Sequence, residues 1–188
     1  MANPTTSGQY FHLLRRQMHR AVRKPLVIPS PKSLLRAKTA RSKVEDLTSG
    51  SFREVLTDPT FAGDPAAVPR VVLTSGKVSH EAIAARNEAG VPVAVLRVEQ
   101  LYPWPYDHLN EALADYPNAR ELVWLQEEPE NMGPWNFVKG KLYEALGDRF
   151  TIKRVSRFES GSPATGSKAV HDQERAMILS EALDLNAG

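Results

Sequence analysis

Short apolar runs alternate with helical patterns through the second half of the chain. The runs at residues 71–73, 91–98, 122–125 and 151–155 are typical of buried strands. Between and after them, apolar residues recur at helical spacing over residues 78–88, 106–116, 134–146 and 170–185. Alternating strands and helices with short connections predict an α/β fold: a mostly parallel sheet of about five strands with helices on both faces.

The first part of the chain has a different pattern. Apolar residues at helical spacing over residues 10–22 predict an amphipathic helix that ends before Pro25, with Arg15, Arg16 and Arg20 mostly off its apolar side. Residues 26–28 form a short strand candidate, and residues 29–36 read as a turn that opens a short helical piece. A strand, loop and helix in that order can present backbone N–H groups to an anion.

A stretch rich in proline and small residues separates the two patterns. Pro59, Gly63, Pro65 and Pro69 fall within residues 57–69, which predicts a linker. We therefore expect a basic first unit at residues 1–58, a linker at 59–69 and an α/β domain at 70–188.

Charge is distributed unevenly along the chain. Ten lysines and arginines and no acid precede Glu45, so the rest of the chain holds 14 basic and 22 acidic residues. A block of +10 beside one of −8 indicates an anionic partner for the first unit, and a solvated charged face is the alternative reading. We expect no nucleic-acid partner, because neither a helix-turn-helix pattern nor the stacking aromatics of an RNA-binding sheet is present.

Composition narrows the class of protein further. The 188 residues are 41% hydrophobic and 24% charged, as in ordinary soluble domains. No cysteine is present, which excludes disulfides, thiol nucleophiles and thiolate-held metals. No apolar stretch approaches the roughly 18 residues of a membrane span, so we expect a cytoplasmic protein without a membrane partner.

Three segments of the predicted α/β domain hold candidate chemistry. The turn 74–77 (TSGK) lies between a strand and a helix, but it lacks the earlier glycine and the following Ser or Thr of a phosphate-binding loop. Residues 126–135 bring three acids to the carboxyl end of a strand, where we favour interface pairing with basic residues of a neighbouring surface and helix N-terminal charge over cation binding. Residues 99–106 form a proline-stiffened aromatic loop that suits an interface or core packing.

Seven motifs in order resemble one known family, over about residues 9–185. The motifs are YFHLLRRQ (10–17), RKPL (23–26), PKSLLR (31–36), TSGK (74–77), RVEQL (97–101), QEEP with NMG (126–129 and 131–133) and PATGS (163–167). With these motifs the chain resembles the carboxyl-terminal part of the decarboxylating component of 2-oxoglutarate dehydrogenase, a thiamine diphosphate-dependent, transketolase-like family.

The resemblance implies a parent reaction that this region does not perform alone. The family decarboxylates 2-oxoglutarate with thiamine diphosphate and Mg²⁺ and transfers a succinyl unit to a lipoyl group. Its cofactor motifs and catalytic residues belong to regions upstream of the matched part, so we expect no catalytic residue and no bound cofactor in this chain. The segment Gly63-Asp64-Pro65 with Asn87 departs from the family's Gly-Asp-Gly and Asn pattern. Related enzymes acting on 2-oxoadipate share this architecture, so the substrate rests on resemblance alone.

The resemblance also implies partners and an effector. Residues 1–58 match the end of a pyrimidine-binding domain, and the region from about residue 68 matches the carboxyl-terminal domain, which builds the homodimer. We expect contacts with the upstream catalytic domains, with the lipoyl-bearing acyltransferase and, as in some bacterial members, with acetyl-coenzyme A. Phosphate binding is assigned to Arg16, Arg20, Lys32, Ser33 and Arg36. Two alternatives stay open: pairing of these residues with acids of other domains or the second subunit, and a stand-alone acyl-coenzyme A or nucleotide-binding module.

Overall fold

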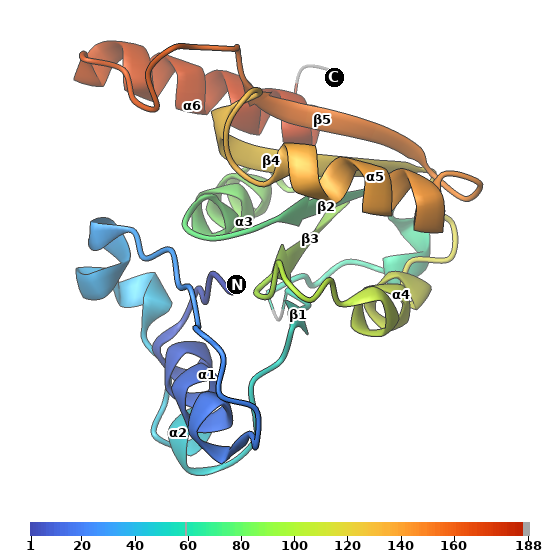
Figure 1. Ribbon diagram of the computed structural model, residues 1–188. Coiled ribbons are helices and arrows are strands. Elements are labelled where there is room, and N and C mark those ends of the chain that lie inside the picture. Colours follow the sequence, from blue (N-terminus) through green and yellow to red (C-terminus); the bar gives the residue numbers. More distant parts are fainter. Residues whose placement is uncertain (59, 186–188) are drawn as a thin grey trace.

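A five-stranded sheet forms the centre of the chain (Figure 1). The computed structural model describes residues 1–58 and 60–185, so Pro59 of the predicted linker and residues 186–188 of the predicted domain lie outside the described residues. The sheet order is β1-β3-β2-β4-β5, in which β1 pairs antiparallel with β3 and all other pairs are parallel. The strands are β1 (Val55–Leu56), β2 (Arg70–Thr74), β3 (Val93–Val98), β4 (Glu121–Pro129) and β5 (Thr151–Arg157).

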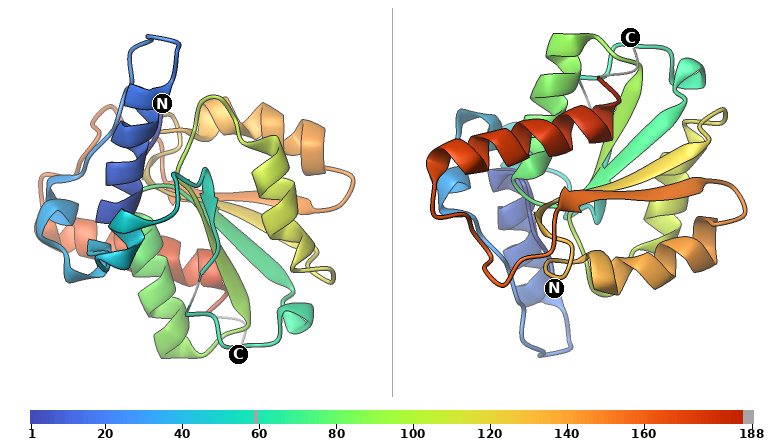
Figure 2. Two further views of the ribbon diagram at one scale, coloured as in Figure 1. Left: turned by 90° about the horizontal axis from the view of Figure 1, so that it is seen from below. Right: turned by 90° about the horizontal axis from the view of Figure 1, so that it is seen from above.

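Helices cover both faces of this sheet (Figure 2). One face packs against α4 (Tyr106–Ala114) and α5 (Trp135–Leu146), and the other against α3 (Val78–Ala89) and α6 (Lys168–Leu183). The central strands β2 and β3 are therefore buried along their whole length. This arrangement confirms the predicted α/β fold with a mostly parallel sheet of five strands.

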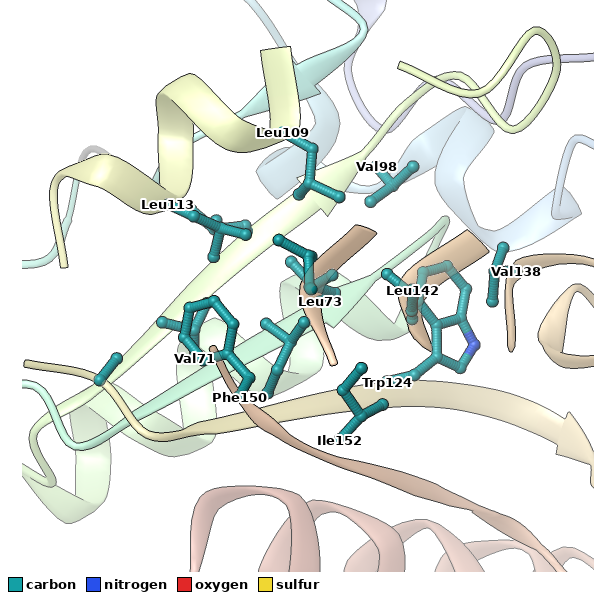
Figure 3. Packing of buried hydrophobic residues seen from close by; sticks show 14 of the residues in the cluster. Val71, Leu73, Val98, Leu109, Leu113, Trp124, Val138, Leu142, Phe150 and Ile152 are labelled. Carbon is teal, nitrogen blue, oxygen red and sulfur yellow. The ribbon is translucent and has the colours of Figure 1, made fainter. Parts of the chain in front are cut away.

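Two hydrophobic clusters hold the layers together. On the α4–α5 face, Trp124 and Leu73 of the sheet pack with Leu142 of α5 and Leu113 of α4 (Figure 3). On the opposite face, side chains of α6, including Ile178, pack against alternate residues of the same strands. Because side chains alternate across a strand, one apolar run supplies both clusters.

The regular elements of the first part of the chain are mainly helices and 3₁₀ turns, and few of its residues are buried. Its elements are α1 (Ser7–His19), the 3₁₀ turns η1 (Lys32–Arg36) and η2 (Lys38–Ala40), and α2 (Glu45–Thr48); a further 3₁₀ turn, η3 (Pro65–Ala67), precedes β2. Helix α1 was predicted, and the Thr6 hydroxyl caps it by accepting from the Gln9 amide. It ends at His19, three residues earlier than predicted.

The prediction of a strand at residues 26–28 is wrong. This segment has no ladder in the structure, although the carbonyl oxygen of Val27 accepts one hydrogen bond from the Ala2 amide (3.0 Å). Leu26 and Ile28 instead pack on a small cluster of Ala2, Leu13 and Phe52. The strand that does join the sheet from this part of the chain is β1, which lies at the end of the predicted first unit and has only two residues.

The amino-terminal segment and the predicted linker both lie against the α/β layers. Ala2 bridges to Gln100, and the amide of Asn3 donates to the carbonyl oxygen of Glu99 (2.7 Å). After β1, the buried Asp58 carboxylate pairs with Arg86 of α3. Within the described ranges, no helix is long and apolar enough to cross a membrane.

Candidate functional site

Arg16, the leading phosphate-binding candidate, is held inside the chain. Its Nη1 donates to Glu54 Oε1 (2.6 Å) and its Nη2 to Gln100 Oε1 (2.6 Å), while the guanidinium lies 4.2 Å from the centre of the Phe52 ring. Burial, and then the positive charge of Arg20, lower the pKa of Arg16 below its ordinary value. These contacts of Arg16 connect α1 to the edge of the sheet. Arg16 and Arg20 are close enough for their positive charges to repel each other.

The other predicted residues lie on the surface. Arg20 follows the end of α1, and Lys32, Ser33 and Arg36 lie on η1, all exposed. A hollow of about 300 Å³ lies between η1 and the start of α1, where Arg36 is joined by a residue that sequence reasoning did not assign, Arg41. Arg16, Arg20, Lys32 and Ser33 do not line this hollow. The five residues thus divide between the later turns of α1 and the η1 turn.

Two of the predicted loops meet at the carboxyl edge of the sheet. Strands β2 and β4 are neighbours, and the chain leaves β3 to cross over β2, so this point is where the strand order reverses. Lys77 after β2 donates to Glu127 of β4 (2.9 Å) and to Glu81 of α3 (3.1 Å). Burial lowers the pKa of Lys77, but Glu127 and Glu81 together raise it above its ordinary value. This pairing is internal to the chain, and the interface pairing favoured for the acidic loop stays a prediction.

The TSGK turn also receives the amino-terminal segment. Gly76 has φ +76°, and a Cβ atom there would lie 2.4 Å from Nδ2 of Asn3. Glycine therefore serves two needs at this position, a left-handed backbone and room for the Asn3 side chain. The turn is occupied by the chain's own asparagine rather than presented as an open phosphate loop.

A buried polar cluster lies beside this turn, at the end of β3. Thr5 donates from its backbone amide to Glu99 Oε2 (2.8 Å) and from its hydroxyl to Glu99 Oε1 (2.6 Å), and the same hydroxyl accepts from Arg97 Nη1 (3.0 Å). Complete burial raises the pKa of Glu99 to about 7, opposed by the hydrogen bonds from Thr5 and the charge of Arg97. Glu99 and Arg97 fall in a motif used for the family resemblance, but no local pattern predicts that Thr5 reaches them.

Asp64 and Asn87, compared above with the family's cofactor motif, lie in separate local contacts. Asp64 Oδ1 accepts from the Ala66 amide and so caps η3, and Asn87 lies within α3 and donates to Thr60 Oγ1 (3.2 Å). Across residues 1–58 and 60–185, no three His, Asp or Glu side chains gather as metal ligands. Asp64 and Asn87 therefore do not fit the diphosphate-binding arrangement of the family.

The fold and the sheet-edge loops define a carboxyl-terminal domain of the transketolase type. Residues 41–183 match the family model described as 2-oxoglutarate dehydrogenase C-terminal, and the chain belongs to this family. It corresponds to the carboxyl-terminal region of the E1 component.

Similarity to known proteins extends over nearly the whole chain. A multifunctional 2-oxoglutarate metabolism enzyme of Mycobacterium sp. (strain KMS) is 46% identical over 187 residues, which cover 97% of this chain and 15% of the relative. The 2-oxoglutarate dehydrogenase E1 components of Coxiella burnetii and Cupriavidus necator are 42% and 44% identical over 97% of this chain, covering 20% and 19% of their own lengths. The chain thus spans a fifth or less of these relatives.

Proposed function

We propose that this chain is the assembly and regulatory region of a homodimeric, cytoplasmic 2-oxoglutarate dehydrogenase. The parent enzyme decarboxylates 2-oxoglutarate with thiamine diphosphate and Mg²⁺ held by upstream domains, and it passes the succinyl unit to a lipoyl group on an acyltransferase partner. Membership of the family and 38–46% identity to the relatives support this parent reaction.

One observation carries the assembly role: helix α1 exposes a stripe of large apolar side chains. Phe11, Leu14 and Met18, spaced by three and four residues, are 44%, 44% and 74% exposed. A helix face of this kind is normally buried against another surface. The opposite side of α1 already packs through Leu13, so the stripe is available to the upstream catalytic domains and the second subunit.

Sedimentation velocity of the complete parent enzyme tests the assembly role. We expect the double change Leu14→Ser and Met18→Ser to shift the dimer toward monomer and to reduce turnover, because both side chains leave the apolar stripe. Phe158→Ser is the matched control, since Phe158 is 79% exposed and lies outside α1. A double variant that stays fully dimeric and fully active would contradict the assembly role.

The isolated 188-residue chain is inactive in this proposal. Asp64 and Asn87 are engaged in local contacts, which supports the view that the diphosphate is held elsewhere. With thiamine diphosphate, Mg²⁺ and 2-oxoglutarate, we expect no release of carbon dioxide above the uncatalysed rate. Turnover by the isolated chain, measured beside a complete E1 component as a positive control, would refute this expectation.

The regulatory role is binding of the phosphates of acetyl-coenzyme A or a nucleotide by Arg16, Arg20, Lys32, Ser33 and Arg36. The support is positional: four of the five are exposed, and Arg16 in the last turn of α1 is followed four residues later by Arg20, at the C-cap of the helix. Calorimetry with acetyl-coenzyme A should show about tenfold weaker binding for Arg20→Ala or Lys32→Ala, from the loss of one charged hydrogen bond each. Arg23→Ala is the control, and equal affinities in all variants would overturn the assignment.

A stand-alone acyl-coenzyme A or nucleotide-binding module is the second candidate function. The hollow beside η1, lined by Tyr10, Arg36 and Arg41, favours it, because an aromatic ring with two cations suits an adenine nucleotide. The same calorimetry separates the candidates. Tight binding by a monomeric 188-residue chain would support the module, whereas binding that requires the complete dimer would support the regulatory region.

A further inference from the structure

A second hollow, of about 350 Å³, lies at the carboxyl edge of the sheet, away from the basic residues described above. It is bounded by the amino-terminal segment, by the loop after β3, by the end of β4 and by the start of α5. Open parallel sheets place their ligands at this edge, next to the point where the strand order reverses. Neither the assembly role nor the effector assignment uses this hollow.

Aromatic rings form its walls. Trp124 of β4 is completely buried, and its Nε1 donates to Gln126 Oε1 (3.1 Å). Tyr102 and Phe137 stand edge to face nearer the mouth, with ring centres 6.2 Å apart. Lys141 Nζ lies 4.9 Å from the centre of the Phe137 ring, which shows that this ring accepts a cation.

Two buried oxygen atoms of the lining residues lack a hydrogen bond. Ser75 Oγ and Asn3 Oδ1 are both covered from solvent, and neither has a partner among the described residues. The amide of Gln126, by contrast, is fully used: its oxygen accepts from Trp124 and Trp135, and its nitrogen donates to backbone carbonyls. A buried polar atom without a partner is costly, so Asn3 Oδ1 calls for a ligand that donates, and the Ser75 hydroxyl can accept from the same ligand.

Glu128 adds a carboxylate to these acceptors. Burial raises the pKa of Glu128, the charge of Glu127 raises it further, and Arg157 and Lys77 oppose both. Glycine at position 133 leaves room for the Glu128 side chain, because a Cβ atom at that position would lie 2.9 Å from Glu128 Cβ. Glu128 also borders the neighbouring cavity that Arg157 lines.

The hollow offers acceptors without cationic side chains. None of the described residues that line it is lysine, arginine or histidine. The α-amino group of Met1, at the rim, already donates to the carbonyl oxygen of Tyr102 (2.7 Å). Arg157 and Lys77 act on Glu128 from outside the hollow, and neither of them lines it.

We propose that this hollow binds an organic ammonium group carried on an apolar ring or chain. The N–H groups of the ligand donate to the Glu128 carboxylate, Asn3 Oδ1 and Ser75 Oγ, and its apolar body lies against Tyr102 and Phe137. An alcohol of the same shape offers one donor and no charge, and a carboxylate would face Glu128 directly. The proposal stands apart from dimer formation and effector binding, so either can fail without the other.

Calorimetry of the 188-residue chain with three matched probes tests the proposal. The probes are 2-phenylethylamine, 2-phenylethanol and 3-phenylpropionate, which share a ring and differ in the polar group. We expect the amine to bind at least about tenfold more tightly than the alcohol, because the ammonium makes charged hydrogen bonds. We expect no detectable binding of the carboxylate. Similar affinities for amine and alcohol, no binding of the amine, or preference for the carboxylate would overturn the proposal.

Variants then locate the binding. Glu128→Gln should weaken binding of the amine about tenfold through the lost charge, whereas Glu130→Gln, whose carboxylate pairs with Arg154 on the surface, should leave it unchanged. Ser75→Ala provides a second test that leaves the acids in place, and circular dichroism checks that each variant is folded. Unchanged amine binding in both Glu128→Gln and Ser75→Ala would show that the amine binds elsewhere and would refute the site.

Discussion

The α/β layers and the amino-terminal region are stabilised in different ways. The sheet has a large apolar cluster on each face, and its central strands are completely buried. The amino-terminal region has a small cluster around Leu13 and Phe52, while its longest helix exposes Phe11, Leu14 and Met18. The stability of the amino-terminal region therefore depends on its contacts with other surfaces, whereas the α/β layers are stabilised by their own two apolar clusters.

Polar contacts take the place of a core in the amino-terminal region. Glu99 receives two hydrogen bonds from Thr5, and Arg16 joins Glu54 and Gln100. A satisfied polar contact contributes about 0.5–1.5 kcal/mol, less than a buried large apolar side chain. We infer that the α/β layers can remain folded when the amino-terminal segment detaches. The following changes test this difference in stability between the two regions.

The largest expected effect comes from the sheet core. Trp124→Ala removes a completely buried side chain that packs between β4 and the α4–α5 layer, and we expect it to lower the free energy of unfolding by about 4 kcal/mol. Leu14→Ala on the exposed side of α1 should change it by less than about 0.5 kcal/mol. Urea denaturation of both variants measures the contrast. A cost for Leu14→Ala close to that for Trp124→Ala would mean that α1 is packed as a core helix.

The fold could be predicted because the spacing of apolar residues along the chain reflects which positions of a strand or helix are buried. Buried parallel strands such as β2 are continuous apolar runs, and the helices between them carry apolar stripes, so both appear in the sequence. Residues 26–28 carry the same apolar signal but have no neighbouring strand to pair with. Strand β1 has two residues and no pattern of its own, and its pairing with β3 creates it.

The candidate site was only partly predictable for a related reason. Charge and the family resemblance both point to Arg16, but its contacts depend on Glu54 and Gln100, which are distant in sequence. The TSGK turn and the acidic loop were recognised separately, and the Lys77–Glu127 pair that joins them follows from the adjacency of β2 and β4. Local patterns identify chemical groups, whereas topology decides which groups meet.

A smaller effect is expected from pH, through Glu99. Its pKa is raised from 4.5 to about 7 in the folded chain, so the folded state binds more protons than the unfolded state between these values. The stabilisation from this proton is fully present below pH 4.5 and is lost as the pH rises to about 7. The corresponding loss of unfolding free energy is on the order of 3 kcal/mol at most.

The variant Glu99→Gln isolates this contribution. Glutamine stays neutral and can still accept from Thr5, so the part of the pH dependence due to Glu99 should disappear between pH 4.5 and about 7. Urea unfolding at several pH values, with Glu130→Gln as an exposed control, measures the change. An identical pH profile for Glu99→Gln and the unaltered chain would show that residue 99 is ionised throughout.

The smallest expected effect compares two glycines with left-handed backbones. Gly76 (φ +76°) lies against Asn3, whereas a Cβ atom at Gly90 (φ +66°) would meet no atom of the described residues within 4 Å. Each change to alanine should cost about 1–2 kcal/mol from backbone strain. Only Gly76→Ala should also displace Asn3 and speed hydrogen exchange at the amides of Asn3 and Thr5, which donate to Glu99. Equal exchange at these amides in both variants would mean that the amino-terminal segment does not depend on close contact with the TSGK turn, and its attachment would then rest on the Glu99 cluster and the bridge from Ala2 to Gln100.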